Sequence, residues 1–162
     1  MKYSKMKPAF SMLTAIVVVV LMSTVAMFVM SLSSKLTRET TAQFQREQAM
    51  LYAKSYTEYA IMAVTANDRN TTTGSCLSDI DGTIGSPSIG AGYKIEVRLA
   101  YLGHNDEVSG CATTRILDSS VLTAESPLNI MIDVYVKYKE PDHPDATNAP
   151  YITYHKRTLQ KI

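Results

Sequence analysis

Glycine and proline are absent from residues 9–67, and residues 10–34 also lack any charged side chain. A region without these helix breakers favours a continuous helix. The uncharged part begins Phe10-Ser11-Met12-Leu13 and includes IVVVVL at residues 16–21. At about 1.5 Å per residue it is long enough to cross a hydrocarbon core of about 30 Å. The sequence therefore predicts a membrane anchor at residues 10–34.

Cysteine is scarce, with only Cys76 and Cys111 in the chain. Their spacing fits neither a CxxC redox pair nor a zinc site, which needs four ligands. An even pair in an oxidising compartment usually forms a bridge, so we expect a Cys76–Cys111 disulfide, with two free thiols as the alternative. The net charge is only +1 and the basic residues are scattered, so no nucleic-acid partner is predicted.

Catalytic motifs are also lacking, since neither GxSxG nor HExxH occurs. The three histidines, His104, His143 and His155, fall in a predicted turn, a polar loop and a strand, and no Ser or Cys has a base beside it. The chain is therefore predicted not to be an enzyme, and no catalytic residue or cofactor is assigned.

Carboxylates gather at two places, Glu140, Asp142 and Asp145 in one loop, and Asp79 with Asp81 in another. Calcium takes six to eight oxygen ligands, but the spacing does not match an EF-hand. A solvated acidic loop is the preferred interpretation, and no metal ligand is assigned.

The charges around the apolar run set its orientation. Residues 1–9 contain Lys2, Lys5 and Lys7 and no acid, whereas a mixed set of charges follows the run. This asymmetry predicts a cytoplasmic N-terminus and an exported C-terminal part. A cleaved signal peptide is the competing interpretation, with Thr24-Val25-Ala26 as its cleavage site. Its apolar region would span only about 7–15 residues, whereas this run continues to Met30.

Beyond the anchor, residues 35–67 continue the helix, and residues 68–162 form a small β domain. Apolar and small residues recur at three- and four-residue steps on one face of the helix: Ala49, Tyr52, Ala53, Tyr56, Ala60, Ala63 and Val64. Glu47, Lys54, Thr57 and Glu58 are expected in water. Alternating patterns predict strands at residues 93–101, 128–138 and 151–159.

Glycines, prolines and polar residues mark the segments that connect the helix and the strands. Residues 71–92 are predicted to be a loop and residues 103–110 a turn, while residues 111–122 form either a short strand or an irregular connection. The fold class is therefore α+β, with a long N-terminal helix packed on a small antiparallel sheet.

A short basic leader ending in a small residue, followed by Phe-Ser-Met-Leu and a long helix leading into a β domain, resembles the type IV pilins and the pseudopilins of type II secretion. The resemblance is specific over residues 7–34 and architectural beyond them. It implies cleavage by a prepilin peptidase between Ala9 and Phe10, and N-methylation of Phe10. Ala9 departs from the usual glycine at the last leader position.

Thr14 is the larger departure. The fifth residue after the implied cleavage is usually Glu in this family, and its carboxylate can pair with the N-terminal ammonium of a neighbouring subunit. Thr14 has no charge, and residues 10–34 contain no acid. The chain in this respect resembles the minor subunits at a filament tip.

The resemblance implies a structural subunit anchored once in the inner membrane, with its C-terminal domain in the periplasm or in an extracytoplasmic filament. Its implied partners are other pilin-like subunits through the N-terminal helix, prepilin peptidase, the inner membrane and an exported substrate. Secretion, pilus and DNA-uptake systems all share this architecture. The alternative is an unrelated signal-anchored membrane protein that displays a small periplasmic binding domain.

Overall fold

The computed structural model describes residues 9–67, 76–121, 128–140, 143, 145 and 147–162, with side chains from Met12 onward. It contains two compact units, residues 1–43 and residues 44–162. The acidic residue Asp142 and the leader residues 1–8 lie outside the described residues.

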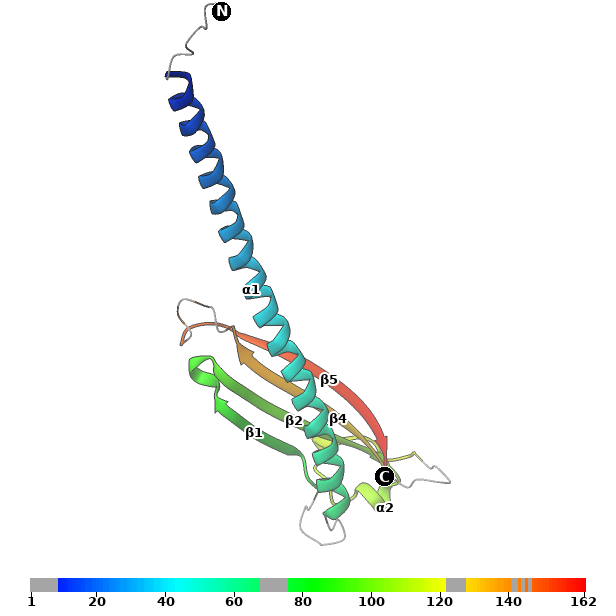
Figure 1. Ribbon diagram of the computed structural model, residues 1–162. Coiled ribbons are helices and arrows are strands. Elements are labelled where there is room, and N and C mark those ends of the chain that lie inside the picture. The colour runs from blue at the N-terminus through cyan, green and yellow to red at the C-terminus, as the bar shows by residue number, and fades with distance from the viewer. Residues whose placement is uncertain (1–8, 68–75, 122–127, 141–142, 144, 146) are drawn as a thin grey trace, which may run out of the picture. The chain divides into compact units, whose positions relative to one another are not determined.

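Helix α1 spans Ala9–Ala66 and is the longest element of the chain (Figure 1). Its length follows from the absence of Gly and Pro, because neither a flexible residue nor a missing amide interrupts the i→i−4 hydrogen bonds. The helix ends at Ala66, and the next amide, of Asn67, donates to the carbonyl of Val64 at 3.3 Å. The predicted continuous helix is confirmed.

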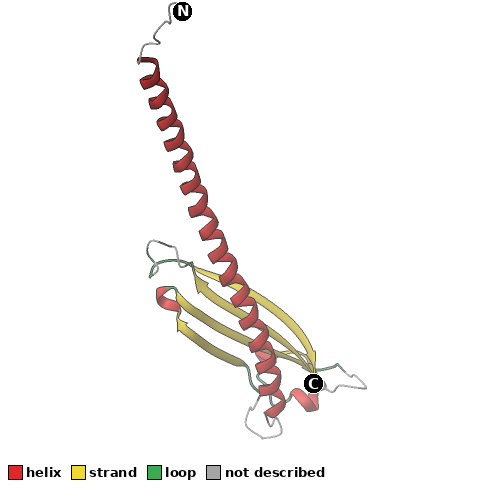
Figure 2. Ribbon diagram, viewed as in Figure 1, coloured by secondary structure: helices red, strands yellow, loops and turns green. Residues whose placement is uncertain are grey.

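The second unit contains an antiparallel sheet of four long strands, with a short fifth strand beside it (Figure 2). The strands are β1 (Asp79–Ser86), β2 (Ala91–Gly103), β3 (Ile116–Asp118), β4 (Leu128–Lys139) and β5 (Tyr151–Lys161). The order across the sheet is β1-β2-β4-β5, and β3 pairs in parallel with the end of β2. The α+β architecture is confirmed, and the three predicted strands are β2, β4 and β5.

Strand β1 corrects the prediction of a loop over residues 71–92. It pairs with β2 over eight residues, from Asp79↔Arg98 to Ser86↔Ala91. A 3-10 turn, Pro87–Ile89, joins the two strands, and Gly90 follows it with a left-handed φ of 81°. The glycines that suggested a loop therefore belong partly to a hairpin, where the turn needs them.

Two shorter elements refine the predicted connections. Residues 103–110, predicted to be a turn, contain the short helix α2 (Asn105–Val108), whose Val108 is fully buried. The uncertain segment 111–122 contains a 3-10 turn, Thr113–Arg115, and then β3. Helix α2 and strand β3 lie at the same end of the sheet, because α2 follows the end of β2 directly and β3 pairs with that end.

The core of the second unit lies between the C-terminal part of α1 and one face of the sheet. Alternate residues of β2 and β4 supply the sheet side. The helix side is supplied by Ala49, Ala53, Ala60 and Val64, which are at most 1% exposed. The small alanines let the helix approach closely, while branched side chains of the strands fill the gap. The predicted packing face of the helix is confirmed.

Thr57 departs from its predicted exposure. It is only 3% exposed, and its hydroxyl donates to the carbonyl of Ala53 at 2.7 Å. Because that bond satisfies the hydroxyl within the helix, the side chain can lie among the alanines under the sheet.

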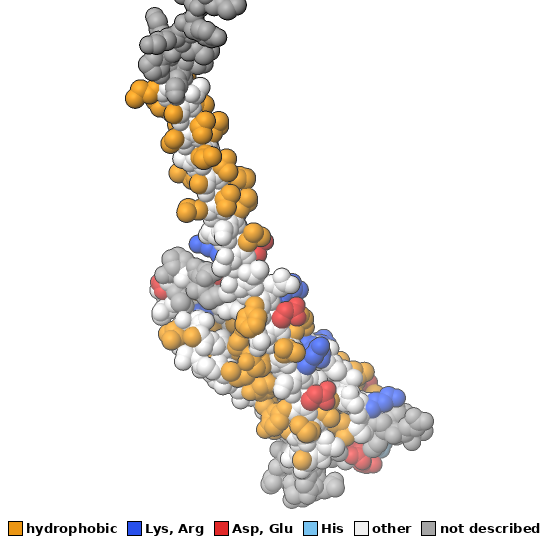
Figure 3. All heavy atoms as spheres, viewed as in Figure 1, with side chains coloured by type: hydrophobic (Ala, Val, Ile, Leu, Met, Phe, Trp, Pro, Cys, Tyr) orange, Lys and Arg blue, Asp and Glu red, His pale blue; other side chains and the backbone are white. Residues whose placement is uncertain are grey.

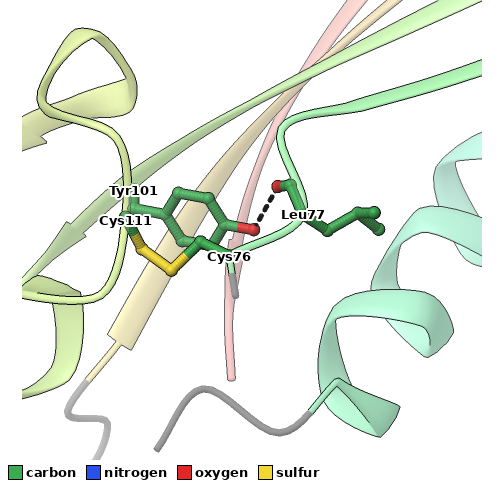
Figure 4. Close-up of a disulfide and its surroundings, with 4 residues drawn as sticks. All are labelled: Cys76, Leu77, Tyr101 and Cys111. Atoms are coloured by element: carbon green, nitrogen blue, oxygen red, sulfur yellow. Dashed lines mark hydrogen bonds between the residues drawn. A yellow bond between two sulfur atoms is a disulfide. The ribbon is translucent and has the colours of Figure 1, made fainter. Parts of the chain in front are cut away.

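The predicted disulfide joins Cys76 to Cys111, with the two Cα atoms 4.8 Å apart (Figure 4). The bridge ties the segment before β1 to the segment that follows α2. Beside it, the buried Tyr101 of β2 donates its hydroxyl to the carbonyl of Leu77 at 2.5 Å. One covalent and one polar link thus fix the start of β1 against the sheet.

Candidate functional site

The first candidate functional region is the apolar part of α1. Its large hydrophobic side chains from Met12 to Leu36 are between 46% and 76% exposed in the isolated chain. Figure 3 shows hydrophobic side chains along the visible face of this part of the helix. This is the single helix in the described chain that is long and apolar enough to cross a membrane.

Two hydroxyl groups within this apolar part are satisfied by the helix itself. Ser23 donates to the carbonyl of Val20 at 2.9 Å, and Thr24 donates to that of Leu21 at 2.8 Å. In a hydrocarbon environment an unpaired hydroxyl would cost free energy, so these bonds make both side chains compatible with lipid.

The processing residues predicted from the sequence lie at the start of α1, which begins at Ala9 and continues through Phe10. Their side chains are outside the described part. Thr14 lies on the exposed helix. Cleavage between Ala9 and Phe10, N-methylation of Phe10 and the role of Thr14 remain predictions.

The second candidate region is the face of the sheet opposite α1, which we call the outer face. Its central carboxylate is Glu96 of β2, whose side chain is only 15% exposed. Lys137 Nζ lies 2.8 Å from Glu96 Oε2, and Lys94 Nζ lies 2.9 Å from Oε1. The hydrogen bond from Lys137 makes the largest contribution and that from Lys94 the next largest, and the pKa of Glu96 is lowered to about 2. The carboxylate is thus held ionised between two ammonium groups.

A second carboxylate of the outer face, Asp133 of β4, binds two side chains of β5. Arg157 contacts both of its oxygens, at 2.7 and 2.9 Å, and His155 Nε2 lies 2.7 Å from Oδ1. The bidentate Arg157 contact, more than any other contact, keeps the pKa of Asp133 below its usual range. The imidazole of His155 also stacks on Tyr135, with ring centroids 4.5 Å apart.

The three histidines of the described chain belong to separate places. His104 precedes α2 and lies 3.1 Å from Asp106, His143 lies in the β4–β5 connection, and His155 is on the outer face. The fold does not gather them into one site, and each has a local polar contact of its own.

Asp145, one of the calcium candidates, is occupied by its own turn. Its carboxylate accepts the amides of Thr147 and Asn148, both at 3.1 Å, and the side-chain amide of Asn148 at 2.6 Å. The Asn148 side chain is the main cause of its lowered pKa. This carboxylate therefore stabilises a turn.

The two carboxylates of the second group, Asp79 and Asp81, pair with arginines. Asp79 lies 2.7 Å from Arg115 and 3.3 Å from Arg98, and Asp81 lies 2.6 Å from Arg98. Within the described residues, no group of three His, Cys, Asp or Glu side chains is arranged to hold a metal ion.

Sequence reasoning missed Lys139, which is the most buried cation of the described chain at 4% exposure. Its ammonium donates to the carbonyls of Ser88 and Thr147, at 2.9 and 2.6 Å, and lies 5.0 Å from the ring centroid of Tyr151. It links the β1–β2 turn to the β4–β5 connection. The alternation of β4 places it on the outer face, and its partners become visible only when the strands are assembled.

Comparisons with family models, with curated proteins and with solved structures find no match to this chain.

Proposed function

We propose that this chain is a pilin-like structural subunit of a type II secretion pseudopilus or of a type IV pilus-type filament. The observation that carries the proposal is α1 itself. An apolar, uncharged helix continues without a break into a helical half that packs on a small disulfide-linked sheet. The first part suits both a bilayer and a bundle of like helices, and the second part displays a folded domain.

In this mechanism, the leader keeps the N-terminus in the cytoplasm while α1 holds the chain in the inner membrane. Prepilin peptidase removes residues 1–9 and Phe10 becomes the methylated first residue. Helices of neighbouring subunits then bundle through their apolar side chains, and the sheet domains face outward. The chain makes and breaks no bonds itself, because packing drives the assembly.

Thr14 favours a minor position near the filament tip. A subunit added below another benefits from a carboxylate that pairs with a neighbouring N-terminal ammonium, since an unpaired charge in hydrocarbon costs several kcal/mol. Thr14 offers no charge for that pairing. In the proposed role, Thr14→Glu changes filament number or the incorporation of the subunit. An unchanged filament number and unchanged incorporation would contradict the tip assignment.

Mass spectrometry of the mature N-terminus tests the class of protein. The protein is isolated from membranes of cells with and without prepilin peptidase. A peptide that begins at methylated Phe10 only when the peptidase is present is the expected result. Ala9→Leu, which replaces the small leader residue, serves as a processing-deficient control.

Other N-termini would contradict the proposal. An intact Met1 under both conditions favours the alternative of a signal-anchored membrane protein that displays a periplasmic binding domain. A new N-terminus near Met27 would indicate an ordinary signal peptide.

A further inference from the structure

Strand β5 forms one edge of the sheet and has no strand beyond it among the described residues (Figure 1). It is 11 residues long, contains no proline, and pairs with β4 from Lys139↔Tyr151 to Asn129↔Lys161 without a shift of register. A long and regular edge presents unpaired backbone groups to any other extended chain. The edge is therefore geometrically able to accept another strand.

The hydrogen-bond pattern identifies the backbone groups that are available. The amide of Ile162 donates to the carbonyl of Leu128 at 3.0 Å, so even-numbered residues of β5 direct their backbone groups toward β4. Because the direction alternates along an antiparallel strand, odd-numbered residues direct theirs away from the sheet. The outward groups belong to Tyr151, Thr153, His155, Arg157, Leu159 and Lys161, and of these the carbonyl of Lys161 already accepts the side-chain amide of Gln160 at 3.0 Å.

The charge of this edge is of one sign. Lys156, Arg157 and Lys161 lie on β5, and the strand contains no acid. Arg157 and His155 already bind Asp133, whereas Lys156 and Lys161 have no carboxylate partner among the described residues. Three side chains of the strand, Tyr151, Ile152 and Leu159, are also 44–61% exposed. A partner strand would gain both ionic and apolar contacts.

Pairing with a second copy of β5 is opposed by the same charges. A two-fold antiparallel pair centred on residue 156 would place Lys156 of one copy opposite Lys156 of the other. Like charges directly across a strand pair are destabilising. The opposite edge, β1, is a poor complement as well, because Arg98 and Arg115 already bind its Asp79 and Asp81.

From these observations we infer that β5 is a docking edge for an extended, acidic peptide segment of another protein, which adds to the sheet as a further antiparallel or parallel strand. Backbone hydrogen bonds supply the attachment, and the lysines select the charge of the segment. This inference concerns the sheet domain alone and does not depend on the proposed filament role.

The test uses the full chain in detergent micelles and a fluorescent 11-residue synthetic peptide, as long as β5, that alternates Glu with Thr or Val. Anisotropy of the peptide measures binding. The control peptides carry Lys in place of each Glu, or Pro at two central positions. The acidic peptide is expected to bind, and both control peptides are expected not to bind.

Two protein variants locate the site. Thr153→Pro removes an outward amide that β4 does not use, so the sheet is retained, as circular dichroism and the melting temperature would report, while peptide binding is lost. Lys156→Glu is expected to weaken binding by about fivefold, because one cross-strand attraction becomes a repulsion. Lys54→Glu, on the exposed face of α1, makes the same charge change away from the edge and is expected to bind normally.

Several results would overturn the inference. They are absence of binding by the acidic peptide, equal binding of the acidic and basic peptides, and full binding by a folded Thr153→Pro variant. A dimer of the full chain in sedimentation experiments that Thr153→Pro dissociates would also overturn it, since the occupant would then be a second copy.

Discussion

The ring of Tyr56 on α1 lies directly against Gly82 of β1. A Cβ atom at position 82 would lie 2.8 Å from Tyr56 Cζ and 2.9 Å from Cε1, closer than real side chains approach. A side chain at position 82 would therefore force the Tyr56 ring to move. Gly82 occupies an inward position between Ile80 and Ile84, both of which pack against the core.

Gly82→Ala is therefore expected to destabilise the protein by about 1–3 kcal/mol through overpacking. Denaturant unfolding of the full chain in detergent measures this change. Combining it with Tyr56→Ala should cost less than the sum of the single changes, because the obstructing ring is absent. Thr83→Ala, at the exposed neighbouring position, is the control. Strict additivity of the two substitutions would show that the ring does not set the requirement.

Removing the disulfide is expected to lower stability. Cys76 and Cys111 are 35 residues apart, and in the chain-entropy model a bridge of this span contributes about 3–4 kcal/mol. The double variant Cys76→Ser/Cys111→Ser should melt at a lower temperature than the oxidised protein. A reducing agent should lower the melting temperature of the wild type and leave that of the variant unchanged. Equal melting temperatures for the two oxidised samples would contradict the structural role.

Lys139→Met is expected to destabilise the sheet domain by about 1–3 kcal/mol, because two carbonyls lose their buried donor. Those carbonyls belong to Ser88 and Thr147. Hydrogen exchange should increase at the β1–β2 turn and before β5 together, since one ammonium links both. Lys161→Met, an exposed lysine of β5 with no carboxylate partner among the described residues, is the control, and it should leave both segments protected.

Stability should fall in acid through Glu96. The pKa of Glu96 is depressed to about 2 in the folded protein. The ordinary value of about 4.3 applies to the unfolded chain. The stabilising contribution is therefore complete above about pH 5 and is lost as the pH falls toward about 2.

Glu96→Gln should remove about 1–2 kcal/mol at neutral pH and reduce the difference in unfolding free energy between about pH 7 and about pH 3. The exposed Glu58→Gln on α1 should leave that difference unchanged. An acid dependence identical to that of the wild type in the Glu96 variant would assign the effect to other carboxylates.

Val20→Lys tests the apolar helix as a membrane span. Val20 is 54% exposed and lies within the uncharged run. A lysine near the centre of a span costs about 2.5–3.5 kcal/mol in insertion experiments. Alkaline extraction should therefore release more of this variant from membranes than of the wild type. Val20→Leu should stay in the membrane fraction. Equal retention of Val20→Lys would contradict insertion at this position.

The elements with unbroken patterns were predictable from the sequence. The helix lacks breakers, and β4 alternates along its whole length, so local rules determine both. The half-buried strand β1 was not predicted, because Gly82 replaces the side chain that would complete its alternation. The reason for that glycine, Tyr56, lies on another element.

Side-chain contacts between neighbouring strands could not be predicted from the sequence. Alternation predicts that Glu96 and Lys137 belong to exposed faces, but their pairing depends on the register that places Glu96 opposite Tyr135 and Lys94 opposite Lys137. Thr57 was misassigned for a related reason. Its hydroxyl is satisfied within its own helix, so a polar residue could occupy a buried position.

The alternation of β4 also constrains how the length of this protein can change during evolution. Losing one residue near Asp133 would exchange the two faces of every residue beyond the deletion, so that Lys137 and Lys139 would take the inward positions of Val136 and Tyr138. Since β4 is paired on both sides, its neighbours could not follow the slip. Homologous sequences should therefore align through β2 and β4 without gaps, and insertions should be found in the connections between strands.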